Sequence, residues 1–278
     1  MRIVLRLAGG LVLCLLSASG IAQSASRCSE LAHIKIPNAS IVLAQSDADG
    51  SLQPPTGKKL TGLPAFCRVA VVSKPASDSN IQIEIWLPEN GWNGRLLGTG
   101  NGGGAGAISF GSLASGLRRH FAVANTDLGT SPNAAAVTGH PDRWSDFGFR
   151  ATHEMTVIAK TIIRDYYGSS PKRSYFSGCS TGGQQALSEA QRYPKDYDGI
   201  IAGAPAGNRT HLHTDFLWNY QATHHERGAL IPPEVVALLT RSVLAACVGK
   251  DGGAPDDHFL TDPRACAFNL ESLRKCSS

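Results

Sequence analysis

A serine framed by two glycines constrains the fold of this chain more than any other feature. Residues 178–182 read Gly-Cys-Ser-Thr-Gly, the G-x-S-x-G pattern of a nucleophile elbow, in which a strand turns sharply into a helix and exposes the serine hydroxyl. Residues 173–177 have the aromatic character of a strand, and residues 183–193 have helical periodicity and end before Pro194. A chain with 30 glycines can contain this pattern by chance, but both flanks fit. We therefore interpret Ser180 as a nucleophile, with glycines beside it because larger residues would clash with the strained turn.

Hydrophobic periodicity on both sides of the elbow predicts strands that alternate with helices. Alternating isoleucines predict a strand over 81–86, and apolar residues at spacings of three and four predict a helix over 152–167. Strands are also expected at 120–126 and 199–203. This order implies an α/β fold, a mostly parallel sheet flanked by crossover helices.

The character of the chain changes after residue 207. Residues 208–223 are polar and aromatic, a helix is expected from Pro233 to Ala246, and residues 247–278 are rich in loops. We therefore expect one main domain over 27–207 and an inserted subdomain over 208–278 that begins here and does not finish.

Residues 1–26 have the pattern of a signal peptide. Arg2 and Arg6 precede an apolar run over 7–16, which small residues follow. The run is too short to span a bilayer, and no later segment is long enough. We expect a secreted or periplasmic protein that does not sit in a membrane. The formal charge is +4, and without Arg2 and Arg6 it is +2, which is too small to indicate a nucleic-acid partner.

The cysteines outside the signal peptide indicate disulfides. Export places them in an oxidising compartment, and six cysteines allow fifteen pairings, so the residues alone leave the connectivity open. Metal binding is the alternative, but the chain contains no C-x-x-C pair and no Cys/His cluster with zinc spacing. These cysteines are Cys28, Cys67, Cys179, Cys247, Cys266 and Cys276.

The glycine-rich run at 98–106 has three interpretations. It half fits a dinucleotide-binding fingerprint, which must lie between a strand and a helix. It could be a flexible linker. It also stands where α/β-hydrolases have an oxyanion loop upstream of the nucleophile. In that case the backbone N–H groups of Thr181 and Gly102 are the expected oxyanion donors.

Three segments together resemble the tannase and feruloyl esterase family. They are the elbow through Gly183, the run from Tyr193 to Ala206, and Trp92-Asn93-Gly94-Arg95 before the glycine loop. The resemblance extends in order from about Cys28 to Cys276. It implies an α/β-hydrolase fold and a secreted serine carboxylesterase that cleaves esters of aromatic acids such as hydroxycinnamic and gallic acids. The implied partner is thus a small aromatic ester, and the chemistry requires no cofactor.

The resemblance also implies the disulfides. Cys28–Cys67 and Cys247–Cys266 match two bridges of the family. Cys179 matches a cysteine that in the family is joined to one beside the catalytic histidine, but no His-Cys dipeptide occurs in this sequence. The partner of Cys179 is therefore missing, and Cys276 is also expected to be unpaired.

The missing His-Cys segment affects the catalytic triad. In the family the acid and the histidine lie beyond the lid, so the resemblance implies that neither lies in this chain, which then represents an N-terminal portion with negligible activity by itself. The alternative is a catalytically inactive secreted fragment, or a binding protein, with half of an α/β-hydrolase fold. A local base would have to come from the histidines that follow the serine, while His153 precedes it and is expected to be packed. Those later histidines are His211, His213, His224 and His225.

Residues 247–263 resemble the calcium loop of the family. Asp251 matches one ligand, Asp256 or Asp257 could supply another, and Gly253 and Phe259 could offer carbonyl oxygens. Calcium requires six to eight oxygen ligands, and Val248 replaces the first aspartate of the family. A structural calcium ion and a solvated acidic turn therefore both remain open.

Overall fold

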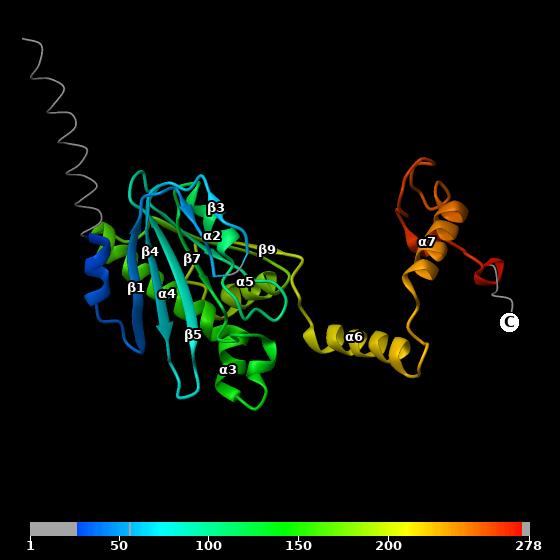
Figure 1. Ribbon diagram of the computed structural model, residues 1–278, viewed down its shortest axis with the longest axis horizontal. Coiled ribbons are helices and arrows are strands. Elements are labelled where there is room, and N and C mark those ends of the chain that lie inside the picture. The colour runs from blue at the N-terminus through cyan, green and yellow to red at the C-terminus, as the bar shows by residue number, and fades with distance from the viewer. Residues whose placement is uncertain (1–26, 56, 274–278) are drawn as a thin grey trace, which may run out of the picture. The chain divides into compact units, whose positions relative to one another are not determined.

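The structure, a computed structural model, describes residues 27–55 and 57–273 and consists of two compact units. The first unit ends at Gly207 and the second begins at Asn208. This is the position at which the sequence predicts that the main domain gives way to the inserted subdomain. Figure 1 labels helices and strands of each unit. The expected signal peptide and Cys276 lie outside the described residues.

A seven-stranded mixed sheet forms the centre of the first unit. On one side of β7, strands β1, β4 and β5 pair antiparallel, and β5 joins β7 in the same way. On the other side, β7, β6, β8 and β9 are parallel. The sheet order is β1 (Ala39–Asp47), β4 (Phe66–Ser73), β5 (Ile81–Pro88), β7 (Ala122–Thr126), β6 (Arg95–Thr99), β8 (Arg173–Cys179) and β9 (Gly199–Gly203).

The predicted parallel arrangement therefore describes the half of the sheet that holds β8, the strand before Ser180. The antiparallel strands β1 and β4 were not predicted from the sequence. A separate two-stranded ribbon consists of β2 (Ser51–Leu52) and β3 (Leu60–Thr61).

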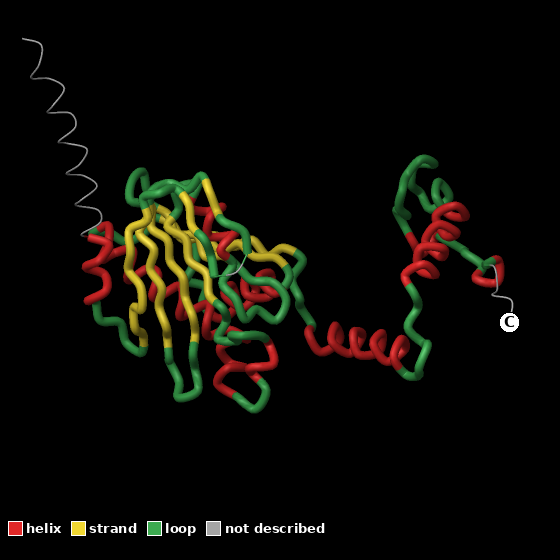
Figure 2. The backbone as a smooth tube through the Cα atoms, in the orientation of Figure 1, coloured by secondary structure: helices red, strands yellow, loops and turns green. Residues whose placement is uncertain are grey.

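Helices cover both faces of the sheet (Figure 2). Helices α4 (Ala151–Tyr167) and α5 (Thr181–Arg192) pack on one face, where α4 residues such as Met155 meet Ile83 and Ile85 of β5 in the larger core cluster. Helix α2 (Phe110–Leu117) packs on the other face against Trp86. Neighbouring residues of β5 thus point to opposite faces, as the two-residue period of a strand requires.

The long helix α4 ends where the sequence predicts. Gly168 follows it in the left-handed conformation with φ 70°, which glycine adopts without steric cost. The shorter elements α3 (Pro141–Ser145), the 3₁₀ turn η2 (Ala134–Val137) and the π-helical turn η3 (Asp146–Arg150) lead into α4.

The second unit contains helices α6 (Arg209–His224) and α7 (Pro233–Cys247) and the 3₁₀ turns η4 (Pro263–Ala265) and η5 (Leu270–Ser272). Helix α6 was not predicted, and its sequence explains why: apolar and polar residues are mixed around it, and it buries none of its side chains. In the part of the chain that the structure describes, no helix has the length and apolar character needed to cross a bilayer.

Strand β9 is the edge of the parallel half of the sheet. Among the described strands it pairs with β8 on one side and with none on the other. Ile201 on this strand is 68% exposed. An open groove of about 660 Å³ lies beside β9 and is lined in part by Arg119, Tyr175 and Ile201.

Candidate active site

Ser180 occupies the turn between β8 and α5. Its backbone has φ 60° and ψ −118°, a conformation that residues with a Cβ adopt rarely and at a cost of order 1–3 kcal/mol. Three backbone hydrogen bonds hold it there. Its N–H donates to Gly203 O at 3.1 Å, and its carbonyl oxygen accepts the N–H groups of Gln184 and Ala206, each at 3.1 Å. The turn is the strained strand-to-helix elbow that residues 178–182 predict, and Ser180 is exposed on it.

Glycines in and around the elbow allow four backbone segments to touch. A Cβ added at Gly178 would lie 2.4 Å from Gly182 O, and one at Gly100 would lie 2.5 Å from the Cα of Gly182. A Cβ at Gly183 would lie 2.3 Å from Gly203 O. The obstructing atoms are backbone atoms, which cannot rotate away. These glycines are therefore required by the close approach of α5 to β8, β9 and the end of β6 as well as by the turn.

The glycine loop is attached to the elbow. Gly182 N–H donates to Asn101 O at 2.8 Å, and Asn101 N–H donates to the side-chain oxygen Oε1 of Gln185 at 2.9 Å. The hydroxyl of Thr181 donates to Gly103 O, and the side-chain amide of buried Asn101 donates to Thr126 O at 2.7 Å.

These contacts decide between the interpretations of residues 98–106. A flexible linker would not be held by hydrogen bonds from buried side chains, so that interpretation is wrong. The dinucleotide fingerprint requires a helix that begins at the glycines, whereas α2 begins at Phe110. Gly102 lies on the attached loop, and a Cβ there would meet nothing within 4 Å. The oxyanion roles of Thr181 and Gly102 stay predictions.

The histidines that could supply a base make contacts within their own unit. Within the first unit, the Ser180 hydroxyl forms no hydrogen bond with a described side chain. His153 is packed, as expected, with its ring stacked on Tyr193 at 3.8 Å. The histidines of the second unit make local contacts: His211 Nδ1 lies 2.7 Å from the amide of Asn208, and His224 stacks on Tyr220.

Two disulfides are formed, and they join the pairs that the resemblance implies. Cys28–Cys67 ties the N-terminal segment to β4, and Cys247–Cys266 closes the second unit. Their partners are 39 and 19 positions apart, so loop closure in the unfolded chain gives about 4 and 3 kcal/mol in the chain-entropy model. Among the described cysteines, Cys179 is free, and it is exposed beside Ser180.

This pairing predicts which thiols react. The oxidised chain of residues 27–278, without the expected signal peptide, is denatured in iodoacetamide without reductant. It should be alkylated at Cys179 and at Cys276, and the four bridged cysteines should be protected. Peptide mapping by mass spectrometry measures this directly. A peptide in which Cys179 is joined to another cysteine of the chain would contradict the prediction.

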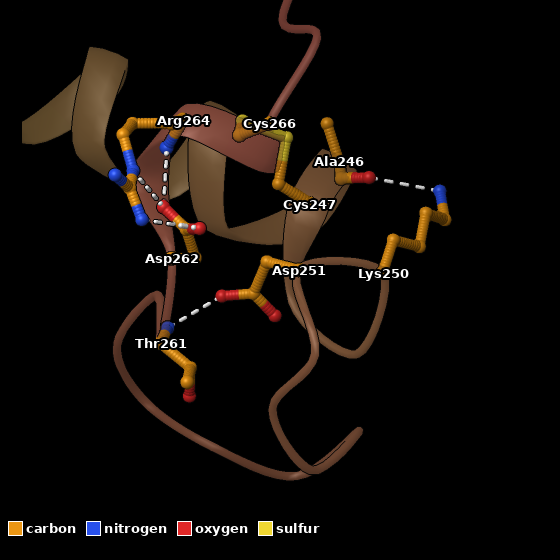
Figure 3. Close-up of a disulfide and its surroundings, with 8 residues drawn as sticks. All are labelled: Ala246, Cys247, Lys250, Asp251, Thr261, Asp262, Arg264 and Cys266. Carbon is orange, nitrogen blue, oxygen red and sulfur yellow. Dashed lines mark hydrogen bonds and ion pairs between the residues drawn. A yellow bond between two sulfur atoms is a disulfide. The ribbon is translucent and has the colours of Figure 1, made fainter.

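The aspartates of the expected calcium loop are already occupied by N–H donors (Figure 3). Both carboxylate oxygens of buried Asp251 accept backbone N–H groups, from Gly253 and Thr261. Although burial raises the pKa of Asp251, these hydrogen bonds outweigh it and lower the pKa overall. Asp262 accepts hydrogen bonds from Nε and Nη2 of the Arg264 guanidinium.

The remaining expected ligands are engaged by other groups of the loop or exposed to solvent. Asp257 accepts the N–H of Ala254 at 2.9 Å, and Asp256 and Phe259 are exposed. Calcium would have to replace several of the hydrogen bonds that now order the loop. Calcium binding through Asp251, Gly253, Asp256 and Phe259 stays a prediction.

Comparisons with known proteins extend the evidence from the elbow to most of the chain. The family model described as tannase and feruloyl esterase matches residues 67–278. This chain belongs to that family. It is 37% identical over 255 residues to an uncharacterized esterase of Xanthomonas campestris pv. campestris, a match that covers 91% of this chain and 44% of the relative. It is 38% identical over 222 residues to a probable feruloyl esterase B-2 of Aspergillus flavus, covering 76% and 40%.

Solved structures of family members show the same fold. The crystal structure of feruloyl esterase B from Aspergillus oryzae superposes with a TM-score of 0.80 at 29% identity, covering 90% of this chain and 51% of that one. An esterase from the same organism gives a TM-score of 0.79 at 31% identity, covering 89% and 50%. The expected α/β-hydrolase fold is thereby confirmed. The chain spans about half the length of these relatives.

Proposed function

We propose that this protein is a secreted serine carboxylesterase that hydrolyses esters of aromatic acids. The observation that carries the proposal is the elbow: Ser180 is held exposed at φ 60° and ψ −118° between β8 and α5 in a chain of the tannase and feruloyl esterase family. This backbone strain presents a hydroxyl at the end of the parallel strands, where α/β-hydrolases carry their nucleophile.

In the proposed reaction the Ser180 hydroxyl oxygen attacks the ester carbonyl carbon and gives its proton to a base. The carbonyl oxygen becomes an oxyanion, for which the N–H groups of Thr181 and Gly102 are the proposed donors. The tetrahedral intermediate expels the alcohol and leaves an acyl-enzyme, which water hydrolyses. The base is a histidine oriented by a carboxylate, both following Ser180 in chain order, as in other α/β-hydrolases.

Two observations support the finer parts of the proposal. The disulfides Cys28–Cys67 and Cys247–Cys266 suit an oxidising compartment, which supports secretion. The names of the relatives, feruloyl esterases among them, support an aromatic acyl group.

The test is hydrolysis by the protein expressed from its complete reading frame. Methyl ferulate and methyl gallate are compared with methyl cyclohexanecarboxylate as a non-aromatic control, and product acids are measured by liquid chromatography. We expect turnover of at least one aromatic ester, well above the control ester. Folded protein that hydrolyses none of the three esters would overturn the esterase assignment. Equal turnover of all three would overturn the aromatic preference and leave the esterase assignment standing.

A further inference from the structure

Three side chains that can ligate metals meet on the face of the sheet that α4 and α5 cover. His153 lies on α4, Glu189 lies near the end of α5, and Asp196 lies on the connection from α5 to β9. The Nδ1 atom of His153 is 2.6 Å from Oδ2 of Asp196. One donor atom from each of the three residues lies within 4.8 Å of the other two. Glu189 is nine positions beyond Ser180 on one helix, roughly 13 Å along its axis, so this cluster is separate from the proposed esterase site.

Glu189 is the member of this cluster that needs a partner. Its side chain is fully buried, with 0% of its surface exposed, and neither carboxylate oxygen accepts a hydrogen bond from a donor group of the described residues. A buried carboxylate without a partner is costly, and proteins neutralise such groups with a proton or a cation.

The other two ligands are held in place by their neighbours. The His153 ring stacks on Tyr193 at 3.8 Å with an interplanar angle of 9°, so its orientation is set by packing. The Lys160 ammonium group donates a hydrogen bond to the backbone oxygen of Asp196. The His153 side chain is 29% exposed and that of Asp196 is 12% exposed, so an ion can reach the cluster from solvent without unfolding the helices.

We propose that His153, Glu189 and Asp196 bind a zinc ion. One imidazole and two carboxylates are a donor set that zinc accepts, with ligand bonds of about 2.0–2.2 Å and a fourth position left for water. The two carboxylates balance the charge of the ion, and Glu189 gains the partner that its buried oxygens lack. Because His153 and Asp196 now share a hydrogen bond, binding exchanges that bond for two bonds to the metal. The ion would link α4 to α5 and to the segment before β9, a structural role.

The test measures bound zinc. Protein is treated with a chelator, its free thiols are alkylated to remove them as competing ligands, and it is dialysed against zinc chloride. Zinc per chain is then counted by elemental mass spectrometry after gel filtration. We expect about one bound zinc per chain of wild-type protein. Glu189→Gln and Asp196→Asn should each weaken the affinity for zinc by more than about a hundredfold. The matched control is His211→Gln with His213→Gln on α6, which should retain the zinc.

Melting curves measured with and without zinc show whether the ion stabilises the fold and whether each variant is folded. Zinc should raise the melting temperature of the wild type and of the α6 control variant, and should leave that of Glu189→Gln unchanged. Glutamine mimics a protonated Glu189, so this variant is expected to fold as well as the metal-free wild type. Three results would each overturn the proposal: wild-type protein that binds no zinc, zinc that persists in both Glu189→Gln and Asp196→Asn, or zinc that is lost from the α6 variant. The first result would indicate that Glu189 is neutralised by a proton.

Discussion

Replacing Ser180 with alanine is expected to reduce kcat for the hydrolysis of aromatic methyl esters by a factor of about 10⁴ or more. The substitution removes the oxygen that forms the acyl-enzyme, and only the residual rate from the oxyanion donors and from substrate binding would remain. The measurement is steady-state kinetics on methyl ferulate or methyl gallate with protein from the complete reading frame.

Ser188→Ala is the matched control because it alters the same helix without touching the elbow. Ser188 makes one long hydrogen bond, to Gly148 O at 3.4 Å, so its loss should change kcat by less than about twofold and stability by less than about 1 kcal/mol. Activity in Ser180→Ala equal to that of Ser188→Ala would show that another residue is the nucleophile.

Replacing Gly178 with alanine is expected to destabilise the first unit by about 3 kcal/mol or more. The added Cβ would lie 2.4 Å from Gly182 O and 2.7 Å from Gly182 Cα, so the start of α5 would have to move away from β8. Inserting a methyl group into a well-packed region costs about 1–3 kcal/mol. We expect a cost at the upper end of this range or above it, because the obstructing atoms belong to the backbone and cannot rotate away. Calorimetry of the purified variant measures the loss as a lower melting temperature.

Gly111→Ala provides the comparison for this substitution. Gly111 lies in α2, and a Cβ there meets nothing within 4 Å. Alanine has a helix propensity about 1 kcal/mol better than that of glycine, so this variant should be as stable as the wild type or more stable. If Gly178→Ala melted at the same temperature as Gly111→Ala, the close backbone contact at the elbow would be disproved.

Local patterns were sufficient where a segment's own residues determine its structure. The three-and-four spacing of Met155, Ile158 and Ile162 identified α4, and Gly168 identified its end. Strand β9 was predicted with its observed bounds. In contrast, α6 was not predicted, because its residues form no apolar face. Strands β1 and β4 were not predicted either, although β4 alternates between buried and half-buried residues.

The cluster of His153, Glu189 and Asp196 could not be found from the sequence. The first two are 36 positions apart and the last two are seven apart, spacings that match no metal motif. The three meet because α4 and α5 pack side by side on one face of the sheet. The sequence-based expectation that His153 is packed describes its stacking on Tyr193 correctly, and it misses the carboxylates that packing brings beside it.

The amino-acid sequence by itself determined the elbow, the alternation of strands and helices and the family, because each depends on residues close together in the chain or on long runs of similarity. The tertiary structure decided three further matters: that the sheet is antiparallel on one side of β7, that Gly100 as well as Gly178 must lack a side chain, and that Glu189 is buried without a partner. Each depends on distant segments approaching within a few ångströms. Such an approach depends on how the packed core closes, and short sequence patterns carry no direct record of it.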